Sequence, residues 1–218
     1  MSRVIFIPRK KSSAAALSSI SVFATAISTA ETITLPDGIE EGDLIVLFQV
    51  AIDADSTPPA LVTPSGFSSI DSATITSIIS YRTEVAYKLA DGTEGGTSIT
   101  GMSGNNSDHK RVVVFRGDVA ATTAIVADVE SVVDSGNPPA QTVTSGSGTA
   151  PLIVFGTWTA TASEQDRTMT PEKDGELGSG ATWIGWKIYN SSPANVSVDT
   201  ADHGINMMQS FYIELSNA

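Results

Sequence analysis

The chain has 218 residues, of which 41% are hydrophobic and 17% are charged, a balance opposite to that of a disordered chain. The length is enough for one large β-sandwich or two small domains, of which we favour one, and the absence of cysteine excludes disulfides, thiolate catalysis and cysteine metal sites. The net charge of -12 disfavours direct nucleic-acid binding, because phosphate contacts need clustered Lys and Arg.

The charge is distributed unevenly. Residues 1–30 contain Arg3, Arg9, Lys10 and Lys11 and no acidic residue, which gives +4, whereas the remainder carries -16. Such a basic segment either docks on an acidic surface, including that of a second copy, or stays a solvated leader. We expect residues 1–30 to form an extended N-terminal arm used in assembly and residues 31–218 to form the folded β-sandwich domain.

The same arm departs from the layout of a secretion signal. Arg9–Lys11 precede the alanine-rich stretch Ala14–Ala26, but serines interrupt that stretch. The apolar run Val4–Ile7 comes before the charges, where a signal peptide is polar. We therefore do not expect secretion by this route. No stretch of the sequence approaches an apolar membrane span, so we expect no membrane partner.

The first strand patterns lie between residues 44 and 115. Leu44–Phe48 is apolar at consecutive positions, which is typical of a central strand covered on both faces. Ile79–Leu89 alternates between apolar and polar residues, the period-two pattern of a strand with one buried face. Val112–Phe115 repeats the consecutive apolar pattern. A second face of these runs would meet a loop, the N-terminal arm or a neighbouring subunit.

The second half of the chain continues in the same way. Leu152–Phe155 is another run that is apolar on both faces. Trp183–Tyr189 predicts a strand in which Gly185 indicates a bulge or a close backbone contact. Phe211–Leu215 alternates again and predicts a strand near the C-terminus.

Turn signals rich in Gly and Pro separate these strands, for example Pro36–Gly38 and Gly136–Pro139. Short strands at this spacing predict an all-β fold, an antiparallel β-sandwich that is jelly-roll-like. No segment has a convincing amphipathic helical pattern. Only Ala14–Leu17 and Val119–Val126 could form a helical turn.

The two halves of the sequence echo one another. In the first half, the run Leu44–Val46 is followed in order by a Thr-Pro pair, by Tyr87-Lys88, by an Asp-His pair and by a final strand. In the second half, Leu152–Val154 is followed by the same series, with Trp186-Lys187 in place of Tyr87-Lys88. The order matches although the spacings drift, whereas a convincing repeat holds its period. Either the two halves form a double Greek key, as in a jelly roll, or the similarity arises by chance among strands of low complexity.

Residues able to support catalysis are few. His109 and His203 are each preceded by an aspartate, but neighbouring positions on a strand point to opposite faces. Both lie just before a predicted strand in polar sequence, and no Gly-x-Ser-x-Gly elbow supplies a nucleophile. We expect exposed loop histidines, no catalytic residues and no enzymatic activity.

Cofactor and metal motifs are also missing from the sequence. Asp53-Ala54-Asp55 alternates like a calcium loop, but Ser56–Pro59 follows in place of further ligands and a positioned glycine. Asp199 and Asp202 have no better companions, so we expect solvated turns. The glycine-rich segment Gly92–Gly96 does not open a predicted helix, as phosphate-binding loops do. We expect no cofactor-binding residues, no metal and no cofactor.

The three tryptophans raise the question of a sugar-binding platform, since rigid ring faces pack on apolar sugar faces. Trp183 and Trp186 are three positions apart in a predicted strand and therefore face opposite sides of it. At most one of them, or Trp158, would serve on a given face. We favour packing in the core or at a subunit interface over sugar binding.

Four segments of the first half carry a resemblance to a known family: Leu35–Val46, Pro64–Phe67, Ala86–Gly92 and Val112–Gly117. With them, Ile33–Gly117 resembles tailed-bacteriophage virion proteins of β-sandwich fold. Ala150–Leu215 resembles the return portion of the same sandwich more faintly. Each motif is a strand-and-turn pattern without chemistry.

The resemblance implies a non-enzymatic structural role in the virion, as a head decoration, a head spike or a tail-associated subunit. It implies that the partners are other virion proteins, namely capsid, portal or tail subunits, and further copies of the chain in a homo-oligomer. A trimer is expected by analogy with phage appendages. The alternative is a carbohydrate-binding or receptor-binding module for a host surface glycan. A hydrolase on the same scaffold is the third hypothesis.

Overall fold

The computed structural model of the chain describes residues 16–53, 58–76, 80–100, 109–133, 141–144, 151–160, 169, 172–179, 182–190, 195–198 and 205–217. These residues form strands and turns, and every strand pairing is antiparallel. The predicted all-β, antiparallel fold is confirmed for this part of the chain. Within it, no helix is long and apolar enough to cross a lipid bilayer.

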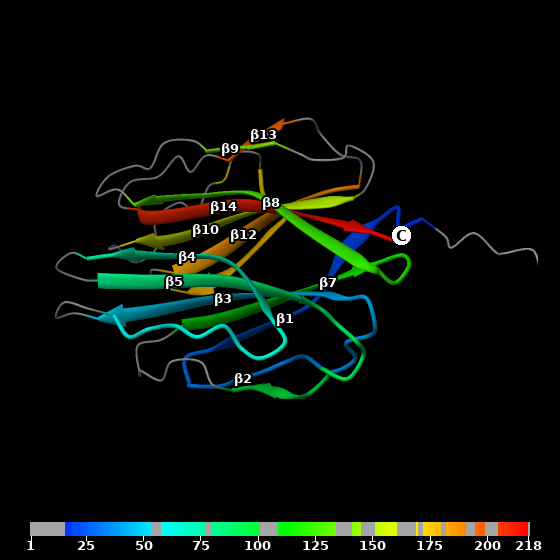
Figure 1. Ribbon diagram of the computed structural model, residues 1–218, viewed down its shortest axis with the longest axis horizontal. Helices are drawn as coiled ribbons and strands as arrows, with labels where there is room; N and C mark the ends of the chain where they lie inside the picture. Colours follow the sequence, from blue (N-terminus) through cyan, green and yellow to red (C-terminus); the bar gives the residue numbers. More distant parts are fainter. Residues whose placement is uncertain are drawn as a thin grey trace, which may run out of the picture.

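The first half of the chain forms one five-stranded sheet (Figure 1). Its strands are β1 (Ile20–Ser28), β3 (Leu44–Asp53), β4 (Ser68–Ile75), β5 (Ser80–Leu89) and β7 (His109–Gly117). They lie in the order β1-β7-β3-β5-β4. Two short strands, β2 (Ile33–Thr34) and β6 (Ser98–Ile99), pair with each other outside this sheet.

The second half forms the other five-stranded sheet. Its strands are β8 (Thr123–Val133), β10 (Leu152–Ala160), β11 (Gly175–Ser179), β12 (Thr182–Tyr189) and β14 (Ile205–Ser216). They lie in the order β11-β12-β10-β14-β8, and β9 (Gln141–Thr144) pairs with β13 (Asn195–Val198). In Figure 1 the pair β9–β13 lies above both sheets and β2 lies below them.

The two halves have the same strand topology. The order β1-β7-β3-β5-β4 becomes the order β8-β14-β10-β12-β11 when each strand number is raised by seven, and the pair β2–β6 becomes β9–β13. The echo in the sequence therefore reflects a structural duplication. Each sheet draws all of its strands from one half of the chain.

The cross-strand pairing shows that the alignment of the two halves by sequence is wrong by one residue. The cross-strand pair Val46–Tyr87 in the first sheet occupies the place of Phe155–Trp186 in the second. The Leu-Ile-Val letters that match in the two halves are therefore offset by one residue in the structure. A shift of one residue moves each side chain of a strand to the opposite face of the sheet. The equivalent residues of the two halves are therefore those that point to the same face, and not those with the same amino-acid type.

The two sheets contribute side chains to one shared hydrophobic core. Phe155 stacks on Phe211 with ring centroids 4.8 Å apart, both within the second sheet. Phe115 of the first sheet meets Phe155 edge-on at 5.5 Å and Trp186 edge-on at 5.8 Å. Such edge-on contacts are a favoured geometry for aromatic pairs, and here they join one sheet to the other.

The outer faces of the central strands are also covered by the chain itself. Ile45, Leu47, Val112 and Val114 are fully buried beneath residues of β2, β6 and the turn before β3, namely Ile33, Leu35, Ile39 and Ile99. In the second sheet, the outer cluster contains Leu152, Val154, Met169, Trp183, Met208 and Tyr212. The three runs predicted to be buried on both faces are therefore confirmed as central strands.

The N-terminal boundary lies earlier than expected. Ile20–Ser28, placed in the arm by the sequence, forms β1 and pairs with β7. Leu17 and Ile20 belong to the shared core. β1 is an edge strand of small and uncharged residues, so its side chains give little of the alternation that marks a strand. Residues 1–15 of the predicted arm lie outside the described residues.

Neither segment considered for a helical turn is helical where it is described. Val119–Thr122 has no regular secondary structure, and β8 begins at Thr123. Of Ala14–Leu17, only residues 16 and 17 are described, and they are irregular.

Phe115 and Phe155 provide a direct test of the shared core. Phe115→Leu and Phe155→Leu should each lower the free energy of unfolding by about 1–2 kcal/mol, because each ring is fully buried. Since the rings are in contact, the double variant should depart from additivity by about 0.5–1 kcal/mol in urea unfolding. Val114→Ala, on the outer face, should be additive with Phe155→Leu. Strict additivity of the two phenylalanine variants would contradict the facing arrangement.

Candidate functional site

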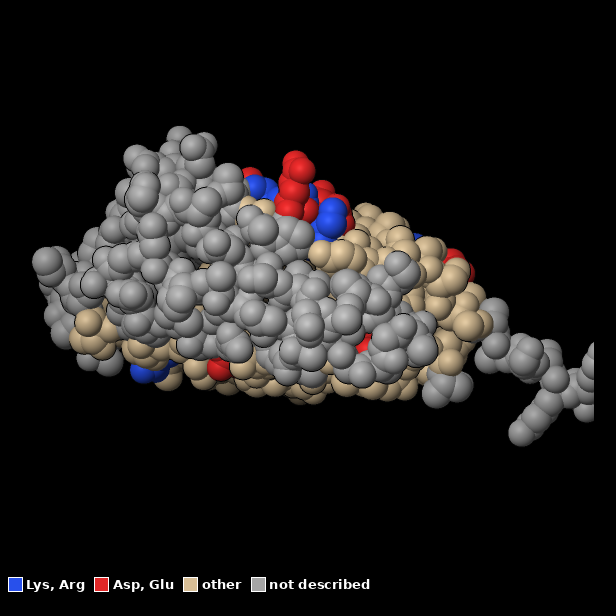
Figure 2. Space-filling model, turned by 90° about the horizontal axis from the view of Figure 1, so that it is seen from above, with Lys and Arg blue, Asp and Glu red and all other residues tan. Residues whose placement is uncertain are grey.

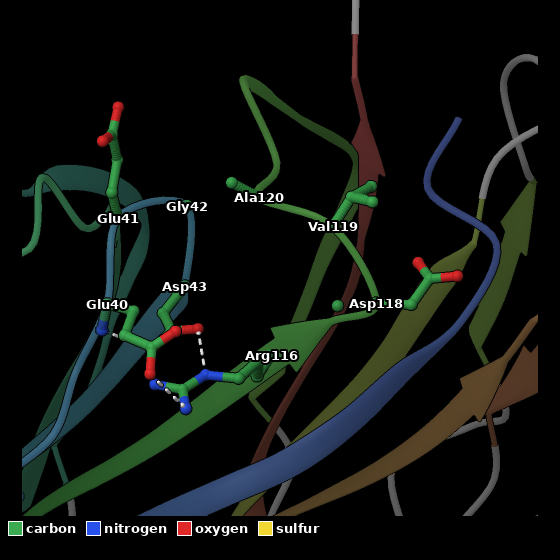
Figure 3. Close-up of a pocket in the computed structure, with 9 residues that line it drawn as sticks. Glu40, Glu41, Gly42, Asp43, Arg116, Asp118, Val119 and Ala120 are labelled. Carbon is green, nitrogen blue, oxygen red and sulfur yellow. Dashed lines mark hydrogen bonds and ion pairs between the residues drawn. The ribbon is translucent and has the colours of Figure 1, made fainter. Parts of the chain in front are cut away.

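An ion-pair cluster joins the turn before β3 to the end of β7 (Figure 3). Arg116 donates from Nε to Asp43 Oδ1 at 2.9 Å and from Nη2 to Asp43 Oδ2 at 2.7 Å, a two-point contact. Its Nη1 reaches Glu40 Oε1 at 3.1 Å, and its Nη2 also donates to the Gly38 carbonyl at 2.7 Å. The guanidinium carbon lies 3.9 Å from the centre of the Phe23 ring in β1. One side chain thus ties the turn, β7 and β1 together.

The turn that presents Asp43 depends on a glycine. Gly42 has a φ of 86°, and a Cβ at this position would lie 2.7 Å from the Cα of Ala120. Asp43 is buried and accepts a hydrogen bond from the Glu40 amide at 2.9 Å. The Gly42 amide donates to the Ala90 carbonyl at 2.9 Å, and the Ala90 amide donates to the Asp43 carbonyl at 2.8 Å. The backbone therefore holds one buried carboxylate in front of Arg116.

The pocket beside this cluster has a volume of about 140 Å³ and is lined mainly by acidic residues and short loop residues. The hydrogen bond with Asp43 raises the pKa of Arg116 above its already high ordinary value, so the guanidinium stays charged. Glu41 and Asp118 point away from Arg116 in Figure 3. The nine described lining residues include no Ser, Thr, Lys or His that could form a nucleophile–base pair. The arrangement stabilises a turn and has no evident catalytic geometry.

Asp118 anchors the segment that leads into β1. Its carboxylate accepts hydrogen bonds from the amides of Ser18 at 3.0 Å and Ser19 at 3.3 Å, and from the Ser18 hydroxyl. The Asp118 amide donates to the Ser19 carbonyl at 3.1 Å. The hydrogen bond from the Ser18 side chain, followed by that from its backbone, lowers the pKa of Asp118 below its ordinary value. The described chain is thus fixed to the end of β7 before β1 begins.

One of the two histidines, His109, lies among the described residues. His109 is the first residue of β7 and is half-buried, so it lies within a strand and not in an exposed loop. The prediction of an exposed loop was therefore wrong for His109, because β7 starts earlier than its apolar run. Asp108 and His203 lie outside the described residues.

The carboxylates considered for a metal loop give no site in the described part of the chain. Asp53 is the last residue of β3 and is half-buried. Residues 54–57, Asp199 and Asp202 lie outside the described residues. No group of three or more His, Cys, Asp or Glu side chains within the described residues is arranged to hold a metal ion.

The tryptophans of β12 are packed inside the molecule. Trp186 is 4% exposed in the core between the sheets, and Trp183 is 5% exposed in the outer cluster of the second sheet. They face opposite sides of the strand, as predicted. Gly175, on β11, leaves room for the Trp186 ring, since a Cβ there would lie 2.5 Å from Trp186 Cζ2. Both rings serve packing and neither forms an exposed platform for a sugar.

Several of the described Lys and Arg side chains are paired with carboxylates. At the top of the face shown in Figure 2, Lys and Arg side chains lie among Asp and Glu side chains. Lys88 Nζ lies 2.6 Å from Glu94 Oε1, and Lys187 Nζ lies 2.6 Å from Asp174 Oδ1. These pairs stabilise turns at the margins of the sheets. That nucleic acid is not a partner stays a prediction.

The edge strands differ in how they are protected against pairing. Four strands form the outer edges of the two five-stranded sheets: β1, β4, β8 and β11. β4 contains Asp71, β8 contains Asp128 and β11 contains Glu176, and charged residues on an edge discourage unwanted strand pairing. β1 contains no charged residue over its nine positions. Of these four described edge strands, β1 is the one without a charged residue.

β1 also presents apolar side chains to the solvent. Val22 is 36% exposed, Phe23 is 38% exposed and Ile27 is 49% exposed. A groove of about 460 Å³ opens beside the start of this strand, lined by Val22, Asp174, Trp186, Ile188 and Asn190 among others. An extended edge beside a partly apolar groove is the geometry that binds an added strand. This β1 edge, residues 20–28 with the groove, is the candidate interaction site.

Comparison with known proteins finds no match to any protein-family model, to any curated protein or to any solved structure.

The β1 edge was not predicted from the sequence, because this strand does not alternate between bulky apolar residues and polar residues. The available signal was the complete lack of charge between Ser12 and Ala30, in a protein with 24 acidic residues. The Arg116–Asp43 contact joins residues 73 positions apart, and no local pattern could reveal it.

Gly42 and Gly66 provide a matched test of the turn before β3. Both have positive φ, at 86° and 83°, but a Cβ at Gly66 would come no closer than 3.7 Å to Lys88 Nζ. Gly66→Ala should therefore cost only the backbone strain, about 1 kcal/mol. Gly42→Ala adds a clash with the Ala120 backbone and should cost more than about 3 kcal/mol. Chemical unfolding measures both, and equal losses would refute the close approach at Gly42.

Asp118 should make the anchoring of residues 18 and 19 sensitive to acid. Since its pKa is lowered in the folded chain, the carboxylate contributes stability above the ordinary aspartate pKa and loses it as the pH falls through the lowered value, below about pH 4. Protection factors of the Ser18 and Ser19 amides should fall over that range. Asp118→Asn should show the low protection already at pH 7. Protection that is independent of both changes would contradict the assignment.

Proposed function

We propose that the chain is a non-enzymatic structural subunit of a tailed-bacteriophage particle that acts through protein–protein assembly. The observation that carries the proposal is the β1 edge, where Val22, Phe23 and Ile27 are partly exposed on an uncharged strand of a protein with net charge -12. Edges of this kind invite pairing with another chain, and proteins that stay monomeric usually blunt them. A subunit that must join neighbours benefits from keeping one such edge.

The polar residues of the described part support the same role. Arg116, Asp43 and Asp118 hold turns and the entry into β1, and Glu94 accepts hydrogen bonds from two backbone amides and from Lys88. Burial tends to raise the pKa of Glu94, and the bonds from Lys88 and the backbone lower it overall. Charge is thus used to fix loops. This suits a rigid building block that has no disulfide to stabilise it.

We propose to classify the fold as a β-sandwich of two duplicated halves. The shared core of Phe115, Phe155 and Trp186 supports the sandwich. The strand order argues against the jelly-roll-like form, because a Greek key that spans two sheets takes strands from both halves, whereas here each sheet belongs to one half. The relevant repeat is a seven-strand unit.

The type of particle rests on the resemblance of Leu35–Val46 and Val112–Gly117 to tailed-phage virion proteins. In the structure, these two segments contain the Arg116 cluster and its turn, so the resembling residues are those that hold one end of the first sheet together. The proposed partners are capsid, portal or tail subunits and further copies of the chain, as a trimer by analogy. The proposed location is the virion. A glycan-binding role has less support, since Trp183 and Trp186 are buried.

Particle composition tests this proposal. Tailed particles released by cells that carry this gene are purified on a density gradient, and their proteins are identified by mass spectrometry. We expect the chain in several copies per particle, at a ratio to the major capsid protein that stays constant across the particle band. A deletion strain that is complemented with the gene serves as the control. Finding the chain only in the soluble fraction, with particles complete without it, would contradict the proposal.

A further inference from the structure

The duplicated fold is closed on one side and open on the other. On the closed side, β4 lies against β8, and Gln209 of β14 donates to Asp71 of β4 at 2.7 Å. The duplication relates β4 to β11 and β8 to β1, so an equally closed molecule would bring β1 against β11. Instead β1 lies against β12, beside the groove of about 460 Å³. The two halves repeat each other, but this contact is not repeated.

Inner-facing residues of β1 are left exposed on the open side. Val22 pairs with the core residue Phe115, and directly opposite residues on paired strands share a face. Ile27 pairs with Arg111, which also lies opposite the core residue Phe48. Val22 and Ile27 therefore point to the same side as the core, yet they are 36% and 49% exposed. Among the described residues, the core side chains of β1 are therefore only partly covered along this edge.

The backbone of β1 is available as well. β1 is first in its sheet and pairs only with β7 among the described strands. At its start, the Ile20 amide donates to Asn190 Oδ1 at 2.8 Å, which closes that end of the edge. Beyond Ile20, a strand added along β1 would bond to the backbone and place alternate side chains over Val22 and the groove. The groove is partly apolar, with Val22, Trp186 and Ile188 in its lining, so apolar side chains of the added strand would fit it.

The geometry points to the apolar run Val4–Ile7 of a second copy as this added strand, antiparallel to β1. The inference rests on the proposed assembly role and names its contact. Val4–Ile7 consists of β-branched and aromatic residues, which favour strands, and Pro8 ends it. Eight residues, 8–15, lie between Ile7 and residue 16, where the described chain begins, and the stretch from Ile7 to residue 16 spans at most about 30 Å. The run is long enough to add a strand, and this reach is what a contact with a neighbouring copy requires.

Charge sets the direction of the strand. In an antiparallel arrangement, Arg9–Lys11 pass beyond the start of β1. At that end lie Asp118, which holds the segment before β1, and Asp174, which lines the groove, and both are exposed. The +4 of residues 1–30 would thus offset part of the repulsion between bodies that carry -16 each. A head-to-tail contact of this kind closes into a ring when the rotation allows it, which includes a trimer.

Disulfide trapping tests the contact, because the chain contains no cysteine of its own. Full-length Phe6→Cys and Thr25→Cys proteins are mixed and oxidised, with Ile5→Cys as a second arm position because a disulfide needs Cα atoms about 4.4–6.8 Å apart. At least one mixture should yield about tenfold more linked dimer than a mixture with Ala60→Cys, an exposed control position away from β1. Removing residues 1–3 alone should leave the link intact.

Three results would overturn the inference. In a protein that carries both Phe6→Cys and Thr25→Cys, a disulfide formed only within one chain would show that the β1 edge pairs with the N-terminal segment of the same chain. Linked dimers of Thr25→Cys alone would show that two β1 edges pair with each other. No link at either arm position would leave the edge to a different partner. Each of these is compatible with the chain being found in particles, so the failure of this contact is distinct from the failure of the proposed function.

Discussion

The contact between Phe115 and the aromatic residues Phe155 and Trp186 is the interaction on which the rest of the structure depends. It brings two sheets together that come from separate halves of the chain and share no strand. Each sheet must also bury its outer face, and the pair β2–β6 with the neighbouring turn does so for the first sheet. Once both faces of the central strands are covered, only the edges are left to meet solvent or another chain.

The sequence predicted the parts of the fold that depend on local pattern. Leu44–Phe48 and Leu152–Phe155 were found because consecutive apolar residues mark a strand buried on both faces. β1 was missed because an edge strand of small residues has little alternation to show. The duplication was visible in the sequence as the same order of motifs in both halves. The sequence alignment of the two halves was wrong by one residue, because amino-acid types alone do not reveal which face of the strand a side chain points to. The Arg116–Asp43 pair depends on tertiary contact and could not be read from spacing.

Charge has two uses in this chain. Within the described residues it fixes turns, through Arg116 with Asp43 and Lys88 with Glu94. Across the whole chain it separates a basic N-terminus from an acidic body, and in the proposed assembly the basic segment of one copy would offset part of the repulsion between the acidic bodies. The β1 edge combines an absence of charge, exposed apolar residues and nearby acidic groups. In the proposed assembly, a basic segment of another copy would therefore meet little electrostatic opposition at this edge.

The most direct test of an assembly role for β1 is the amide exchange of residues 21–28 as a function of protein concentration. We expect slow exchange at high concentration and faster exchange on dilution, while the central strands β3 and β10 stay protected throughout. Exchange in β1 that is rapid and unchanged from dilute to concentrated protein would rule out pairing of β1 with another copy.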